Sequence, residues 1–186
     1  MALAIVPKIS SIFSLFGSLW IITEVATEKT KRGVPYHRLL LAMSVYDVLE
    51  SIGNFFSTWP IPKGSPDVIW AHGNTATCTA QGFFLTLSSA VPLYNAMLSV
   101  YYYLVINYNY TDTRLRSFVE PAMHVFCFLW AFGTALTSAL AGLINNADLW
   151  CWIAPSPHDC KESWRHGTLE EGDHNARVGG AGIGVY

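Results

Sequence analysis

Two acidic side chains lie inside an apolar stretch of the sequence. Asp47 and Glu50 are the only charged residues of segment 39–59, which reads LLLAMSVYDVLESIGNFFSTW. Ionisable residues within membrane helices are rare and costly, so they are functional candidates by default. We interpret Asp47 as an ion-binding or conformational-switch position. For Glu50 there is an equal alternative, in which it only hydrogen-bonds to polar neighbours inside a helix bundle.

Uncharged polar side chains follow a helical spacing in the same segment and in segment 78–108. In a membrane helix such a stripe turns toward other helices, because lipid offers these groups no hydrogen-bonding partner. We therefore expect the stripe of segment 78–108 to face Asp47. Its members Asn95 and Ser99 would either line a ligand cavity or bond to segment 39–59. The stripe of segment 39–59 comprises Ser44, Asp47, Ser51, Asn54 and Thr58, and that of segment 78–108 comprises Gln81, Ser88, Pro92, Asn95 and Ser99.

The composition indicates that these side chains are held by membrane helices. Of 186 residues, 52% are hydrophobic and only 13% are charged, whereas soluble domains have about 25% charged residues. The apolar runs predict an all-α membrane protein, an antiparallel bundle of four transmembrane helices within residues 1–143. Residues 144–186 are expected to form an extracellular loop and an unstructured tail. The four helices are predicted at about 3–25, 39–59, 78–108 and 118–143.

The third of these helices is the longest. About 30 residues at about 1.5 Å each give about 45 Å, which exceeds a hydrocarbon core of about 30 Å. Pro92 near its middle predicts a kink, because proline removes a backbone hydrogen bond.

Positive charges predict the orientation of the bundle. Short loops on the cytoplasmic side carry an excess of Lys and Arg. Loops 28–38 and 111–116 together carry six such residues, whereas the opposite side carries only Lys8 and Lys63 near the membrane. We therefore expect a multi-pass protein, placed in the plasma membrane, with the N-terminus and the C-terminal tail outside. The six residues are Lys29, Lys31, Arg32, Arg38, Arg114 and Arg116. The sequon at Asn109 would then be cytosolic and unused.

This orientation predicts different environments for the four cysteines. Cys127 lies in the middle of the fourth helix and is expected to be reduced. Cys78, Cys151 and Cys160 lie on the oxidising side. The bridges 78–151, 151–160 and 78–160 are all compatible with the sequence, since spacing does not fix connectivity.

Several function classes have no support in the sequence. We find no phosphate-binding loop, no nucleophile elbow and no HExxH motif, so an enzyme is not predicted. No cofactor or metal site is expected either, since His124 has no second histidine at ligand spacing and is expected to bond to a neighbouring helix. Without a basic run, nucleic acid is not an expected partner, and the predicted partner is the lipid bilayer. Glu120, followed by Pro121, suits the first turn of the fourth helix.

Two phrases of the sequence, CTAQGFF…PLYNAMLSVYYYLVI and LWCWI, together with LLLAMSVYDVLESI, resemble a receptor family. They are similar to the cyclic-AMP-receptor-like G-protein-coupled receptors of protists, which are related to the secretin-like class. The resemblance covers about residues 1–165, corresponding to helices one to four and the second extracellular loop. It implies the first four helices of a seven-helix fold and a bridge between Cys78 and Cys151. It also implies an outward-facing mouth for an extracellular ligand of unknown identity, and coupling to a heterotrimeric G protein from the inner face.

The chain departs from this family in two ways. Such receptors often place a basic residue at the inner end of helix three, where this chain has Asn107, so weakened coupling is expected. The coupling end would comprise Asn107, Tyr108, Arg114 and Arg116. Helices five to seven are not in the sequence, so we expect a truncated receptor that does not signal alone. The alternatives are a four-helix membrane scaffold and a channel or transporter subunit, the latter favoured by the two intramembrane acids.

Overall fold

Four long helical segments form the chain's architecture. The computed structural model describes residues 2–65 and 68–154. The first two spans are α1 (Ala2–Thr27) and α3 (Pro35–Phe56). The third consists of α4 (Thr75–Leu87) and α5 (Ala90–Tyr108), and the fourth is α7 (Glu120–Leu140). Each span is long and apolar enough to cross a membrane. The prediction of an all-α membrane protein with four antiparallel transmembrane helices is confirmed.

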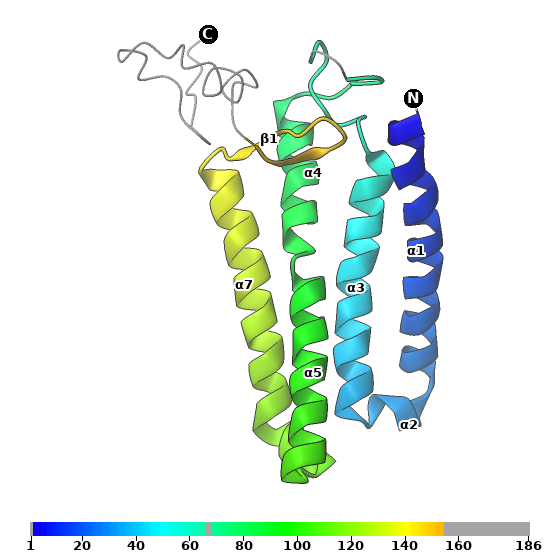
Figure 1. The fold of residues 1–186 in the computed structure, drawn as a ribbon, viewed down its shortest axis with the longest axis vertical. Helices are drawn as coiled ribbons and strands as arrows, with labels where there is room; N and C mark the ends of the chain where they lie inside the picture. The colour runs from blue at the N-terminus through cyan, green and yellow to red at the C-terminus, as the bar shows by residue number, and fades with distance from the viewer. Residues whose placement is uncertain (1, 66–67, 155–186) are drawn as a thin grey trace.

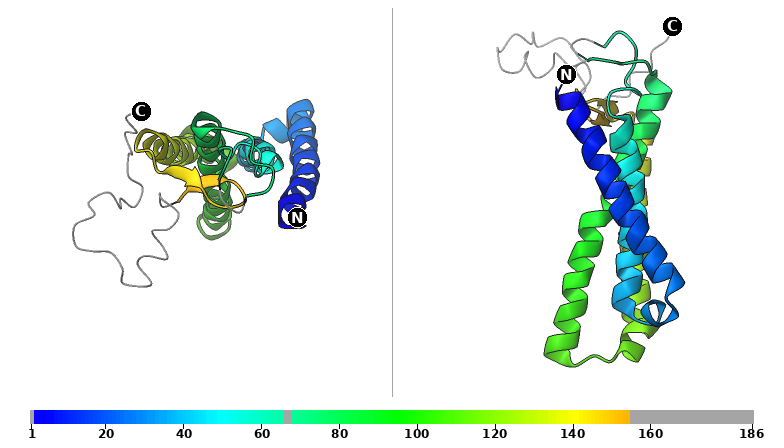
Figure 2. Two further views of the ribbon diagram at one scale, coloured as in Figure 1. Left: turned by 90° about the horizontal axis from the view of Figure 1, so that it is seen from above. Right: turned by 90° about the vertical axis from the view of Figure 1, so that its right-hand side faces the viewer.

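The spans lie side by side in chain order, as Figure 1 shows. α1 packs on α3, which contacts both α4 and α5, and these two helices pack on α7. Figure 2 shows α1 running obliquely across α3. The short helix α2 (Lys29–Arg32) connects α1 to α3.

Residues after the fourth span contain regular structure. β1 (Ile144–Asn146) and β2 (Cys151–Ile153) form an antiparallel hairpin in which Asn146 is opposite Cys151. The predicted loop after the fourth helix thus contains a short hairpin, which was not predicted from the sequence. Residues 155–186, including Cys160, lie outside the described part of the chain.

The helix starts differ from the predicted ones for local reasons. α3 begins at Pro35, four residues earlier than predicted, because proline suits a first helical position. α4 begins at Thr75, after a reciprocal cap in which the Asn74 side chain accepts from the Thr77 amide at 2.9 Å. The Thr77 hydroxyl accepts from the Asn74 amide at 2.8 Å. Before α7, the helix α6 (Asp112–Arg114) and a π-helical turn, η1 (Leu115–Val119), extend the fourth span toward its start.

The third span is broken rather than smoothly kinked. α4 ends at Leu87 and α5 begins at Ala90. Pro92 has no N–H and cannot bond to the carbonyl of Ser88, one turn earlier. That carbonyl instead accepts from the amide of Val91 at 2.9 Å, and the Ser89 amide bonds to Thr86 at 3.0 Å. A kink was predicted at Pro92, and the structure instead has a break one turn earlier, at Ser88 and Ser89.

Buried apolar residues form two clusters, one in each half of the bundle. The first includes Leu39, Tyr94, Leu115 and Cys127, and it joins α3, α5, η1 and α7. The second consists of Ile61, Cys78, Ile144 and Cys151. This second cluster marks the end of the bundle that we call the disulfide end, where the hairpin and loop 57–74 gather (Figure 1).

Candidate functional site

A disulfide joins Cys78 in α4 to Cys151 in β2, with their Cα atoms 5.3 Å apart. This is the pairing that the receptor resemblance implies. Gly82, one turn after Cys78, allows the hairpin to lie directly on α4. A Cβ atom at Gly82 would stand 2.2 Å from a methyl carbon of Ile144 and 3.1 Å from the Cys151 carbonyl oxygen.

The buried side chain of Gln81 connects three segments beneath the disulfide. Its Nε2 donates to the carbonyl oxygens of Gly53 at 2.9 Å and Ser57 at 2.8 Å. Its Oε1 accepts from the Cys151 amide at 3.0 Å. The sequence placed Gln81 on a polar stripe but did not indicate that it holds α3, α4 and the hairpin together.

The predicted acids Asp47 and Glu50 lie with Asn54 along one cavity of about 360 Å³, which we call the polar cleft. It lies between α1 and α3, and Trp150 from the hairpin segment also lines it. The Asp47 carboxylate accepts hydrogen bonds from Ser18 and, at 3.1 Å, from Ser14. The cleft is lined by Val6, Pro7, Ser10, Ser11, Ser14, Asp47, Glu50, Ser51, Asn54 and Trp150.

The polar stripe of the third span is divided by the helix break. Gln81 and Ser88 are buried, whereas Asn95 and Ser99 are exposed on α5. The Ser99 hydroxyl bonds only within its own helix among described residues, to the Asn95 carbonyl at 3.2 Å. The expectation that the whole stripe faces α3 is therefore wrong for Asn95 and Ser99. The break at Ser88 changes which face is buried, so that Tyr94 lies in the core of α5 instead.

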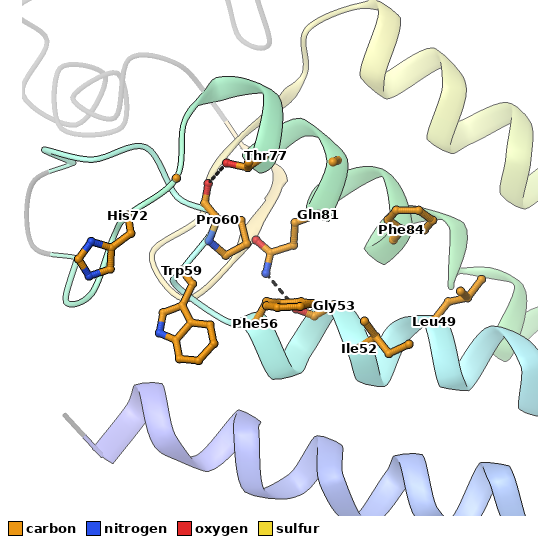
Figure 3. A pocket seen from close by; sticks show the side chains of 12 residues that line it. Leu49, Ile52, Gly53, Phe56, Trp59, Pro60, His72, Thr77, Gln81 and Phe84 are labelled. Atoms are coloured by element: carbon orange, nitrogen blue, oxygen red, sulfur yellow. Dashed lines mark hydrogen bonds between the residues drawn. The ribbon is translucent and has the colours of Figure 1, made fainter.

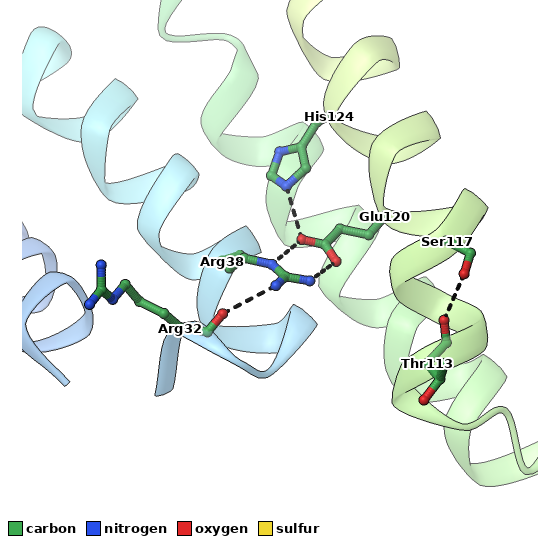
Figure 4. A network of polar contacts seen from close by, with 6 residues as sticks. All are labelled: Arg32, Arg38, Thr113, Ser117, Glu120 and His124. Carbon is green, nitrogen blue, oxygen red and sulfur yellow. Dashed lines mark hydrogen bonds and ion pairs between the residues drawn. The ribbon is translucent and has the colours of Figure 1, made fainter. Parts of the chain in front are cut away.

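A charged network in the other half of the bundle joins four helices, α2, α3, α5 and α7, and Figure 4 shows its charged members. Arg38 of α3 donates from two guanidinium nitrogens to both carboxylate oxygens of Glu120 at the start of α7. Its third nitrogen donates to the Arg32 carbonyl at 3.1 Å. His124 Nε2 stands 3.7 Å from Glu120 Oε1, and His124 Nδ1 is 2.9 Å from the Tyr94 hydroxyl.

This Arg38–Glu120 network is the main feature that the sequence did not reveal. Arg38 counted only as a marker of orientation, and Glu120 only as an acid in a first helical turn. The bond of His124 to a neighbouring helix was expected and is present. The two charged partners are 82 residues apart, so no local pattern connects them.

Lys8 has a structural role at the disulfide end. Its Nζ donates to the carbonyl oxygens of Phe55 at 2.8 Å and Phe56 at 3.2 Å, and lies 4.0 Å from the centre of a Trp59 ring. These carbonyl groups belong to the last turn of α3, where no backbone amide of the same helix is left to bond to them. Lys8 therefore fastens the first turns of α1 to the end of α3.

The residues predicted to form the coupling end lie opposite the disulfide end. Asn107 and Tyr108 close α5, and Arg114 and Arg116 follow within α6 and η1. All four side chains are exposed. The Arg114 guanidinium lies 4.5 Å from the centre of the Tyr110 ring.

Comparison of the chain with protein-family models, curated proteins and solved structures found no match. Within residues 2–65 and 68–154, no three His, Cys, Asp or Glu side chains gather closely enough to hold a metal ion. The site chemistry therefore rests on the disulfide end, the polar cleft and the Arg38–Glu120 network.

Proposed function

We propose that this chain forms the first four helices of a G-protein-coupled-receptor-like signalling protein of the plasma membrane. The observation that carries the proposal is the bridge from Cys78, at the start of the third span, to Cys151, after the fourth. It fixes the hairpin across one end of the bundle. In the receptor reading this segment is the second extracellular loop, so the disulfide end faces outward.

The open face of α5 supports the proposal independently. Asn95 and Ser99 are exposed within the third span. The Ser99 hydroxyl donates to the Asn95 carbonyl, but lipid would offer no partner to the Asn95 side-chain amide. Further helices packing on this face would satisfy that amide, as the remaining helices of a seven-helix bundle would. Signalling then requires those helices, and the four-helix unit is not competent alone.

In this reading the polar cleft forms part of the ligand mouth. Asp47, Glu50 and Asn54 line it, and Trp150 brings the hairpin segment to the same cavity. The heterotrimeric G protein would bind at the opposite end, near Asn107 and Arg114. An amide at Asn107, where the resembled receptors have a basic residue, weakens that contact.

The test begins with the transcript. We expect it to encode three further apolar runs of about 20 residues downstream and in frame. The full product should then stimulate nucleotide exchange on a heterotrimeric G protein in isolated membranes, whereas the 186-residue chain should not. A stop codon directly after Tyr186 in mature mRNA, or a G-protein response from the four-helix chain, would contradict the proposal.

The polar cleft favours one second candidate, a channel or transporter subunit. Two acids at membrane depth mark ion pathways in many membrane proteins, and here Asp47 and Glu50 share one cavity. Cation flux into vesicles containing the chain separates the two candidates. Flux that Asp47→Asn abolishes would support the transporter, and no flux above that of empty vesicles would favour the receptor.

A further inference from the structure

An apolar groove of about 690 Å³ runs between α3 and α4 at the disulfide end (Figure 3). Ile52 and Phe56 of α3 line it together with Ala80 and Phe84 of α4. Trp59 and His72, from the loop between these helices, lie at its outer end. We call this feature the apolar groove.

The apolar groove is continuous with the lipid-facing surface. α3 and α4 both belong to membrane spans, and Ile52, Phe56 and Phe84 remain more than two-fifths exposed beside the groove. α3 ends at Phe56, so its rise from Leu49 amounts to about 10 Å, which is a third of a hydrocarbon core of about 30 Å. The groove therefore lies within one leaflet, and its outer end, at Trp59, lies where tryptophan favours the membrane interface.

The groove has no charged residue in its lining that could bind a charged lipid headgroup. Its lining contains no Lys, Arg, Asp or Glu. The residues that line the groove therefore supply no counter-ion to a lipid phosphate. Lys8 lies over the Trp59 ring, outside this lining, and is hydrogen-bonded to carbonyl oxygens of α3.

Few polar groups of the groove remain available for a ligand. Gln81 is fully hydrogen-bonded to α3 and the hairpin. The Thr77 hydroxyl donates to the Pro60 carbonyl at 2.9 Å. Within the described part of the chain, the imidazole of His72 and the indole N–H of Trp59 have no hydrogen-bonding partner. These two groups suit a single hydroxyl at the outer end.

We propose that the apolar groove binds a sterol from the leaflet at the disulfide end. The fused rings would lie on Ala80 between Phe56 and Phe84, and the hydroxyl would reach His72 and Trp59. A rigid ring system loses less conformational entropy on binding than a flexible acyl chain does. A second hollow of about 360 Å³, lined by Trp59, Trp70 and His72, continues the groove at this polar end. The proposal does not depend on the receptor function.

Photo-crosslinking tests the proposal with the whole chain in phosphatidylcholine vesicles. A photoactivatable cholesterol should label peptides from 52–59 and 75–84, and excess unlabelled cholesterol should remove the label. Ala80→Phe fills the groove and should lower labelling about tenfold, equivalent to about 1.4 kcal/mol of binding. Ala96→Phe places the same side chain at an exposed position of α5 and should leave labelling of these peptides unchanged. Formation of the Cys78–Cys151 disulfide in both variants checks their folding.

A second measurement needs no variant. Cholesterol methyl ether, which has no hydroxyl hydrogen to donate, should compete more weakly than cholesterol. Three results would overturn the proposal: equal labelling of all four spans, labelling unaffected by Ala80→Phe, or labelling that excess unlabelled cholesterol does not reduce.

Discussion

The side chain of Gln81 accepts a hydrogen bond from the backbone amide of Cys151 at 3.0 Å. Gln81 follows Cys78 by three residues, and Cys78 is the cysteine that forms the disulfide with Cys151. The hairpin is therefore attached to α4 twice, by a disulfide and by a buried hydrogen bond. Because the same Gln81 side chain also donates to Gly53 and Ser57, the position of the hairpin is coupled to the end of α3.

Replacing Gln81 by leucine should destabilise the disulfide end. The variant leaves the Cys151 amide and the carbonyl groups of Gly53 and Ser57 without this partner. An unsatisfied buried polar group costs about 1–3 kcal/mol, so we expect a loss of about 2 kcal/mol. Thermal unfolding in detergent micelles, followed by tryptophan fluorescence, measures it. Thr79→Val, a change on the same helix, should have little effect, and an unchanged midpoint for Gln81→Leu would contradict this role.

Breaking the Arg38–Glu120 pair should loosen the contact of α3 with α7. Glu120→Gln keeps the shape of the side chain but removes the charge that faces Arg38. The carboxylate is buried and the arginine is partly exposed, so we expect a loss of about 1–3 kcal/mol. Unfolding by a denaturing detergent measures this loss, and Arg38→Met combined with Glu120→Gln should recover part of it.

A surface ion pair provides the control for that experiment. Lys31 lies 2.5 Å from Glu24, and both side chains are considerably exposed. The hydrogen bond that Lys31 donates to the Glu24 carboxylate raises the pKa of the Lys31 ammonium. Lys31→Gln should nevertheless leave the unfolding midpoint unchanged, because exposed ion pairs contribute little to stability. Equal effects of Lys31→Gln and Glu120→Gln would argue against a special role for the buried pair.

Removing the disulfide should release the hairpin before the helices separate. The bridge joins two cysteines that are 73 residues apart in the chain. Its loss should lower the free energy of unfolding by about 2–4 kcal/mol. In Cys78→Ser we expect protease cleavage within 141–154 under conditions that leave the wild-type hairpin intact. Cys127→Ala, which changes a buried cysteine outside the bridge, should show the wild-type cleavage pattern. Equal protection of the hairpin in Cys78→Ser and wild type would refute the prediction.

The orientation of the bundle can be measured in intact cells. In a Cys160→Ser background, which removes the remaining outer cysteine, we expect Lys63→Cys to react with a membrane-impermeant maleimide from outside. Thr30→Cys, in α2 at the other end, should react only after permeabilisation, because the basic loops favour the cytoplasm. Both positions are exposed. The reverse pattern of labelling, or a glycan on Asn109, would invert the topology.

The positions of the helices could be predicted from the sequence because the length of an apolar run depends only on residues that are neighbours in the chain. The four runs near 3–25, 39–59, 78–108 and 118–143 each correspond to an observed span. The start of α4 at Thr75 carried a local signal as well, since Asn74 and Thr77 have the spacing of a reciprocal cap.

Pairings between distant segments did not follow from sequence. Arg38 and Glu120 each have a satisfactory local explanation, and only the packing of α3 on α7 brings them together. Asn95 was predicted to lie on the same face as Gln81 from a helical wheel, which assumes a continuous helix. The break at Ser88 makes that assumption invalid for residues of α5. Asp47 and Asn54 were predicted on one face of a single unbroken helix, and the structure places them, with Glu50, along one cavity.

The break at Ser88 and Ser89 makes the third span two rigid rods in series. The upper rod, α4, is fastened to the hairpin and to α3 through Cys78 and Gln81. The lower rod, α5, is fastened to α7 through Tyr94 and His124. α3 packs on both rods, so α5 is connected to the disulfide end through α3 as well as through the two serines. The angle between α4 and α5 is therefore fixed by two connections, one along the chain and one across the neighbouring helix.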